Sequence, residues 1–229
     1  MSKQDNKAIK PELKQLIVDT GLDMIRKGMT VGTWGNISYR DPETDLVYIS
    51  PSWMNYTSVR SEHIVVMTTD MEIIDGYTEP SVEKNMHTEV YRCRKDVNAV
   101  IHTHPIYSTV FGVIRESLPA VSEDFAQIVG AEVHNCATYE LPGSAELGKA
   151  AVAALGSNNA VLLPNHGALS VGPTMEITIK VSLVLEKNAQ IYIFSKLLGT
   201  PHLFAPQDIE AMQEFARNQY GKINRELTE

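Results

Sequence analysis

Two histidines separated by a single residue, His102 and His104, follow directly on the apolar segment 97–101. The segment predicts a buried strand, and residues two apart on a strand point to the same face of the sheet. Two imidazoles held on a rigid backbone form half of a site for a transition metal, above all Zn²⁺. Pro105 cannot continue the strand, so the pair is expected at the strand's end. The alternative is two histidines that only make hydrogen bonds at a strand edge.

Two further side chains could complete a catalytic metal site. His166 comes just after the apolar segment 160–164, and three protein ligands with one open position are typical of catalytic zinc. Glu83 follows Ser81, the expected N-cap of a helix, where the helix dipole keeps a carboxylate ionised and able to act as a base or a ligand. The alternatives are a turn histidine before Gly167 and a glutamate that only caps its helix.

The loop 33–38, which continues the glycine-rich turn 32–36, could bind an anion through its backbone N–H groups. A simple connection into the strand that begins at Ile37 explains these glycines equally well. On its own, this segment therefore does not decide between the two interpretations.

Composition limits the class of protein. The 229 residues carry a net charge of −8, with 43% hydrophobic and 21% charged residues, which is typical of a soluble globular protein. An acidic chain is a poor general partner for nucleic acid or an anionic membrane. The N-terminal segment lacks the apolar stretch of a secretory signal, and Cys93 and Cys136 fit no zinc-finger or redox spacing. We expect one cytoplasmic domain over residues 1–229, with both thiols buried and reduced.

Periodicity and turn residues predict irregularly interleaved helices and short strands. Helices are expected over residues 9–27, 81–94, 144–155 and 174–198, after Pro105, and from an N-cap at Asp208. Strands are expected from Ile37 and over 46–50, 64–68, 72–74, 97–104, 132–138, 160–164 and 168–171. Several neighbouring strands predict hairpins, so we expect a mixed or antiparallel sheet with helices on its faces.

Five short motifs together resemble the class II aldolase/adducin family. They are Gly35-Asn36-Ile37-Ser38, Ile49-Ser50-Pro51-Ser52, Pro80-Ser81-Val82-Glu83, His102-Thr103-His104 and Asn165-His166-Gly167. Their order and spacing are most similar to the L-fuculose-1-phosphate aldolase branch, and the similarity runs from the first helix to about Tyr220. It implies a three-layer α/β/α domain with a largely antiparallel central sheet. It also implies a homotetramer whose active sites lie between neighbouring subunits.

The resemblance also implies roles for individual residues. By their match to the family's motifs, His102, His104 and His166 are expected to bind zinc, with Mn²⁺ or Co²⁺ as other divalent candidates. Glu83 is expected to be the catalytic acid/base and an additional metal ligand before substrate arrives. The expected substrate- and phosphate-binding residues are Gly35, Asn36, Ser52, Trp53 and Ser81. Tyr220 is expected to reach a neighbouring subunit's site, although periodicity alone makes it a core residue of the last helix.

The implied activity is the cleavage or formation of a C–C bond in a small ketose phosphate through a zinc-bound enediolate. Sugar-phosphate 4-epimerases and decarboxylases of phosphorylated keto-acids are the nearest enzymatic alternatives, because they share the metal-stabilised chemistry. Glu83 favours an aldolase, since the epimerase branch usually has aspartate there. A metal-free adducin-like scaffold is the alternative of another class, but it would not be expected to retain all three histidines together with Glu83.

Three positions depart from the family's pattern. Trp53 stands where a small residue or glycine is common, and Val82 replaces a second serine before the glutamate. A hydrogen bond to a charged group contributes about 1.5–3 kcal/mol, so the loss of two donors predicts weaker phosphate binding unless residues such as Ser52 compensate. The other interpretation is a substrate without phosphate at that end. Glu123 lies where relatives place a tyrosine or an acidic group, and is either a second acid/base or a helix-start carboxylate.

Overall fold

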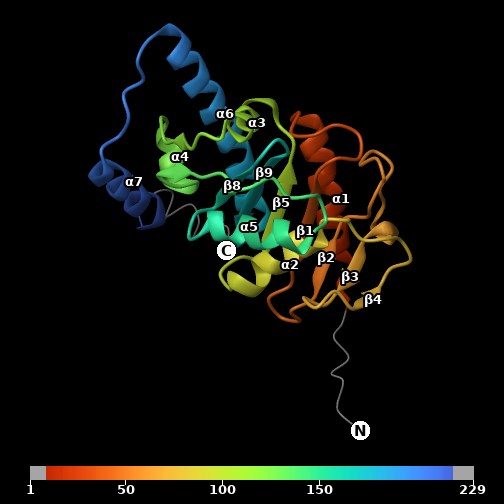
Figure 1. The fold of residues 1–229 in the computed structure, drawn as a ribbon. Helices are drawn as coiled ribbons and strands as arrows, with labels where there is room; N and C mark the ends of the chain where they lie inside the picture. Colours follow the sequence, from red (N-terminus) through yellow and green to blue (C-terminus); the bar gives the residue numbers. More distant parts are fainter. Residues whose placement is uncertain (1–8, 219–229) are drawn as a thin grey trace.

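The protein is built around a seven-stranded antiparallel sheet, and its computed structural model describes residues 9–218 (Figure 1). The strand order is β4-β3-β2-β1-β5-β9-β8, and each neighbouring pair is antiparallel. The strands are β1 (Asn36–Arg40), β2 (Val47–Ile49), β3 (Val65–Met67), β4 (Ile73–Asp75), β5 (Ala99–Thr103), β8 (Ala160–Leu163) and β9 (Gly167–Gly172). A separate short pair joins β6 (Leu118–Pro119) to β7 (Glu132–Val133).

Helices cover both faces of the sheet and make a three-layer α/β/α fold. They are α1 (Pro11–Arg26), α2 (Lys84–Cys93), α3 (Ile106–Ile114), α4 (Glu123–Ile128), α5 (Ala145–Leu155), α6 (Met175–Leu198) and α7 (Pro206–Asn218), with a 3₁₀ turn, η1, at Ser61–His63. α2 and α5 lie side by side on one face, while α1 and α6 pack on the other. The expected fold class is therefore confirmed.

The alternation of side chains along β1 and β5 divides the core between these two faces. Val100 belongs to the core under α2 and α5, whereas its neighbours Ala99 and Ile101 pack in the core under α1. Both faces of β5 are buried, and its five residues are all inaccessible. A strand at this place in the sheet gives the side chains at its end a rigid support. His102 is the fourth of those five residues.

Some sequence expectations were wrong in detail. α2 begins at Lys84 and not at Ser81, because Ser81 N–H bonds to the Ser50 carbonyl (3.0 Å) and holds this segment in a turn. Asp208 lies in the first turn of α7, which begins at Pro206. Cys93 is exposed at the end of α2, whereas Cys136 is buried as expected, and both are free thiols.

The strand expected over 132–138 contains only β7, because its later residues are not paired in a ladder. Within residues 9–218, no helix is both long and apolar enough to cross a bilayer. The expectation of a single domain over 1–229 stays a prediction.

Candidate active site

The side chains of His102, His104 and His166 converge on one point. The Nε2 atom of His102 lies 2.8 Å from that of His104 and 3.2 Å from that of His166. His102 lies in β5, His104 just beyond its end, and His166 in the turn between β8 and β9. The predicted projection of the first two to one side of the strand, and the predicted proximity of the third, are both found in the structure.

Close backbone packing around the end of β5 brings these residues together. β9 pairs with β5, so that Ala168 lies opposite Thr103 and places His166 beside the pair. Gly167 is required here, since a Cβ at that position would lie 2.2 Å from the Thr103 carbonyl oxygen. On the other side of β5, Gly35 adopts a positive φ of 74°, and a Cβ there would lie 2.6 Å from the His102 carbonyl oxygen.

The three imidazoles are neutral and present lone pairs. His102 Nδ1 lies 3.0 Å from the Ala168 carbonyl, which can only accept, so Nδ1 carries the proton and Nε2 is free to bind a metal. Burial lowers the pKa of His102 well below its ordinary value, and the neighbouring His104 lowers it further. Burial also lowers the pKa of His104, and that of His166 to about 3. Neutral imidazole is the form that binds a metal.

The donor set fits a divalent transition metal. Two nitrogens about 2.0–2.1 Å from one tetrahedral Zn²⁺ are about 3.3 Å apart, close to the distances between the histidine Nε2 atoms. One ligand atom from each of the three histidines lies within 4.8 Å of the others. Glu83 Oε1 and His166 Nδ1 are buried without a hydrogen-bond partner, and Glu83 Oε2 is 3.3 Å from His102 Nε2. A cation at the centre would compensate the buried carboxylate.

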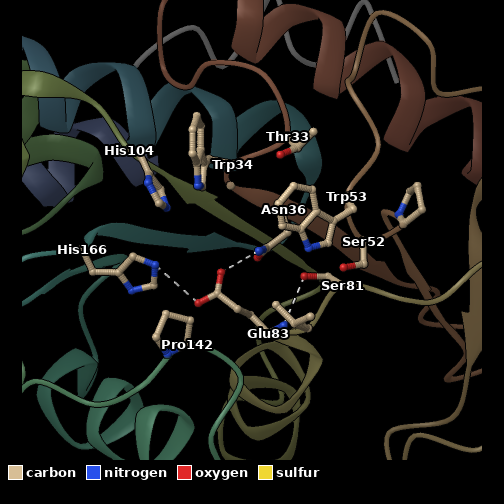
Figure 2. Close-up of a pocket in the computed structure, with 13 residues that line it drawn as sticks. Thr33, Trp34, Asn36, Ser52, Trp53, Ser81, Glu83, His104, Pro142 and His166 are labelled. Atoms are coloured by element: carbon tan, nitrogen blue, oxygen red, sulfur yellow. Dashed lines mark hydrogen bonds and ion pairs between the residues drawn. The ribbon is translucent and has the colours of Figure 1, made fainter.

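Glu83 occupies the middle of the site as the N-cap residue of α2 (Figure 2). Its Oε2 accepts a hydrogen bond of 2.7 Å from the amide of Asn36, while Oε1 lies 3.6 Å from His166 Nε2. Its backbone N–H donates to Ser81 Oγ at 3.2 Å. Asn36 lies directly opposite His102 in the register of β1 on β5, so these two strands fix His102 relative to the Asn36 amide that holds the carboxylate.

A cavity of about 320 Å³ opens in front of the histidines and Glu83. Every residue expected to bind substrate or phosphate lines this cavity, namely Gly35, Asn36, Ser52, Trp53 and Ser81. Glu83, His104 and His166 line it as well. In Figure 2, Glu83 lies between the imidazoles on one side and Ser52, Ser81 and Trp53 on the other. Asn36 uses one amide N–H for Glu83, which leaves the second for a ligand.

One candidate residue of the described chain is not brought to this cavity. Glu123 is exposed at the first residue of α4 and does not line the cavity. Tyr220 lies outside the described residues.

Sequence reasoning missed Pro142 in the cavity wall and His87 behind it. No local pattern marks Pro142. The spacing of four between Glu83 and His87 could have identified His87, because it places both on one face of a helix.

The profile described as "Class II Aldolase and Adducin N-terminal domain" matches residues 15–193. The chain belongs to the class II aldolase and adducin family. It is 39% identical over 197 residues to the 5-deoxy-D-ribulose 1-phosphate aldolase of Bacillus thuringiensis serovar kurstaki, covering 86% of this chain and 92% of that protein. It is 31% identical over 190 residues to the L-fuculose phosphate aldolase of Escherichia coli strain K12, covering 83% and 86%.

Solved structures agree with this assignment. An L-fuculose 1-phosphate aldolase superposes with a TM-score of 0.89 and 32% identity, covering 93% of this chain and 99% of that one. Because these relatives are aldolases, the expectation of a class II aldolase is confirmed at the level of the enzyme family.

Proposed function

We propose that this protein is a metal-dependent aldolase that cleaves, or in reverse forms, the bond between C3 and C4 of a small ketose 1-phosphate. The observation that carries the proposal is the convergence of three neutral imidazoles beside the buried Glu83 carboxylate. A metal site that only hydrolyses its substrate needs a metal-activated water and a base, and does not need further donors for a phosphorylated sugar. A cavity lined with serines and an asparagine beyond the histidines provides room and donors for a phosphorylated sugar.

The names of the relatives support a short ketose 1-phosphate with a methyl end as the proposed substrate. 5-Deoxyribulose 1-phosphate and L-fuculose 1-phosphate share carbons 1 to 3 and a terminal methyl group, and both would give dihydroxyacetone phosphate on cleavage. We propose the five-carbon 5-deoxy compound as the first substrate to test, since the relative named for it is 39% identical to this chain.

We propose His102, His104 and His166 as the residues that hold the metal, with Zn²⁺ as the first choice and Mn²⁺ or Co²⁺ as alternatives. Such a metal supplies a Lewis acid that withdraws electrons from the ketone and stabilises the charge left when the C–C bond breaks. The imidazoles carry no charge of their own, and so leave the full charge of the cation to act on the substrate. Burial of His102 also excludes water from one side.

Glu83 moves the proton at carbon 3. In the direction of cleavage, the electron pair of the C3–C4 bond stays on the three-carbon fragment, and carbon 3 must then take a proton. The Glu83 carboxyl group delivers it, and in the reverse direction removes it. The hydroxyl at carbon 4 loses its proton as the aldehyde forms, and Tyr220 remains the predicted acceptor of that proton.

The phosphate end of the substrate is proposed to lie between two turns joined by backbone hydrogen bonds. Ser52 N–H donates to the Glu79 carbonyl at 2.8 Å, and Ser81 N–H to that of Ser50 at 3.0 Å. The N-terminus of α2 follows, and its dipole favours an anion. The hydroxyls of Ser52 and Ser81 and the second N–H of Asn36 are the proposed donors.

A homotetramer with sites completed by neighbouring subunits stays a prediction, as does a cytoplasmic location. An exposed apolar surface supports the assembly. Large apolar side chains are exposed on α3 and at the end of α6: Ile106, Val113, Ile114, Leu197 and Leu198.

The test is a substrate panel given to zinc-loaded protein. Ketose 1-phosphates, free ketoses and phosphorylated keto-acids are incubated, and dihydroxyacetone phosphate, dihydroxyacetone, pyruvate and carbon dioxide are measured. We expect dihydroxyacetone phosphate from 5-deoxyribulose 1-phosphate, and none after metal removal. Carbon dioxide release would identify a decarboxylase, inversion at carbon 4 an epimerase, and less than a tenth of an equivalent of metal with no activity a non-catalytic protein.

A further inference from the structure

Two rows of buried polar side chains face each other between α2 and β1. Glu83, His87 and Tyr91 are four residues apart, so they lie on one face of the helix and its N-cap. Asn36 and Ser38 are two apart on β1 and point to the same face of the sheet. All five are almost inaccessible to solvent, with 5% exposure or less. We call this set the polar row.

The polar row is a continuous zigzag of hydrogen bonds. Asn36 Nδ2 donates to Glu83 Oε2 at 2.7 Å, and Asn36 Oδ1 lies 2.5 Å from His87 Nε2. His87 Nδ1 lies 2.6 Å from Ser38 Oγ. Ser38 Oγ in turn lies 2.7 Å from the Tyr91 hydroxyl. One end of the chain is therefore the proposed catalytic carboxylate, and the other end is deep in the core.

The carboxylate sets the direction of every donor. Because it can only accept, Asn36 must turn its NH₂ group toward Glu83 and its carbonyl oxygen toward His87. His87 must then donate from Nε2. Burial lowers the pKa of His87 to about 3, so the ring is neutral and has only this one proton. Nδ1 consequently accepts from the Ser38 hydroxyl.

The Tyr91 hydroxyl donates in the same direction as the other members of the polar row. Burial raises its pKa, so it keeps its proton. It lies 2.7 Å from Ser38 Oγ and 3.4 Å from the Asn98 carbonyl, and the shorter contact is the stronger one. Each donor of the polar row thus points toward Glu83.

We propose that His87 is a positioning residue for proton transfer by Glu83, a role that rests on the proposed aldolase function. Its Nε2–H holds the Asn36 amide in the single orientation that offers an N–H to the carboxylate. That contact fixes Oε2 and leaves Oε1, which is buried without a hydrogen-bond partner, directed toward His166 and the point where the three imidazoles meet. Without His87, the amide can turn over and present its oxygen to the carboxylate, which then moves away.

A buried histidine can also serve stability alone, so the experiment separates the two roles. His87→Leu keeps bulk but removes the donor, whereas a glutamine in His87→Gln can donate to Asn36 and accept from Ser38 as the imidazole does. Val90→Ala is the matched control, because Val90 is a buried core residue of the same helix without a polar partner. Its cavity is expected to lower the stability of the protein without removing a hydrogen bond.

For the zinc-loaded enzyme with its ketose phosphate, we expect His87→Leu to lower kcat at least 30-fold and to change KM less than threefold. Exchange of the carbon 3 proton of dihydroxyacetone phosphate into deuterium oxide should fall in parallel, with metal content unchanged. His87→Gln should recover at least a tenth of the wild-type kcat, and Val90→Ala should stay within threefold. Equal kcat in His87→Leu and Val90→Ala, or loss of metal in His87→Leu, would overturn the proposal.

A crystal structure of the metal-loaded His87→Leu protein gives a readout that does not depend on turnover. We expect the 2.7 Å contact between Asn36 and Glu83 to be lost there and kept in His87→Gln. An unchanged contact in His87→Leu contradicts the proposal even if no substrate is found, whereas failure of wild-type protein to cleave any ketose phosphate contradicts only the proposed function. If His87→Leu does not fold, Ser38→Ala is used in its place. Loss of the Ser38 hydroxyl removes the donor to His87 Nδ1, so the imidazole can carry its proton on Nδ1 and no longer donate from Nε2 to Asn36.

Discussion

The two sides of the cavity are built in different ways. The inner side consists of His102, Asn36 and Glu83, which are buried and held by adjacent strands and the start of α2. The outer side consists of Trp34, Trp53 and Val82, which are 60%, 86% and 53% exposed and belong to turns. Regular elements in a packed core hold atoms more accurately than turns do, and turns accept substitution more easily. We therefore expect the inner side to determine the reaction and the outer side to determine the substrate.

The backbone shows the same contrast. His102 lies in a fully buried strand, whereas Trp53 has a φ of +57°, a conformation that side chains other than glycine rarely adopt. A tryptophan at this position is therefore tolerated at some cost in stability, about 1 kcal/mol. Substitutions on the inner side and on the outer side of the cavity, made separately, test whether the two sides control reaction and substrate respectively.

The largest effect is expected from removal of a metal ligand on the inner side. His104→Ala leaves two imidazoles, and the protein should retain less than a tenth of its metal after dialysis and show no measurable cleavage. Metal analysis and dihydroxyacetone phosphate release measure this. Full metal content with normal activity would remove His104 from the site, and Val90→Ala serves as the control for general destabilisation.

Glu83→Gln should preserve the metal but lower kcat by about 10²–10⁴-fold, the usual contribution of an acid/base group. The substitution keeps the size of the side chain and removes its capacity to carry the proton at carbon 3. Metal analysis, kcat and deuterium exchange into dihydroxyacetone phosphate are measured together. Exchange at the wild-type rate would transfer the role to another carboxylate, for which Glu123 is the predicted candidate.

A smaller effect is expected on the outer side. Val82→Ser introduces a hydroxyl beside the proposed phosphate donors Ser52 and Ser81, and should lower KM for the ketose 1-phosphate at least threefold with kcat changed less than twofold. The KM for the corresponding unphosphorylated ketose should not change. A reduced kcat with constant KM would mean that the outer side also controls the reaction, contrary to the comparison.

The smallest effect concerns the pH dependence of stability. Since burial lowers the pKa of His87 to about 3, the unfolded chain binds a proton below pH 6.5 that the folded chain does not. Stability from this group is complete above pH 6.5 and decreases as the pH falls toward 3. From pH 6.5 to 5.5, wild-type protein should lose about 1 kcal/mol more unfolding free energy than His87→Gln.

Urea unfolding at the two pH values, with chelator present and a fixed protein concentration, measures this difference. Equal losses in the two proteins would show that the folded state accepts a proton on His87, and that the imidazole is less isolated from water than its burial implies.

Much of the inner side could be predicted from sequence because its signals are local. The spacing of His102 and His104 on a buried strand places both imidazoles together whatever the rest of the chain does. The start of α2 could not be placed correctly, because the turn at Ser81 is held by a hydrogen bond from its N–H to Ser50, thirty-one residues away. On the outer side, no periodic pattern indicates which turns meet, and so Pro142 was not predicted.

The sequence by itself determined the residue types proposed to bind the metal, the spacing of the histidine pair and the four-residue spacing of Glu83, His87 and Tyr91. Only the tertiary structure decided how these come together. The strand order puts β9 beside β5 and so brings His166 to His102, and the register of β1 places Asn36 opposite His102. Order and register depend on the burial of both faces of a whole sheet, an energy summed over distant segments that no local pattern contains.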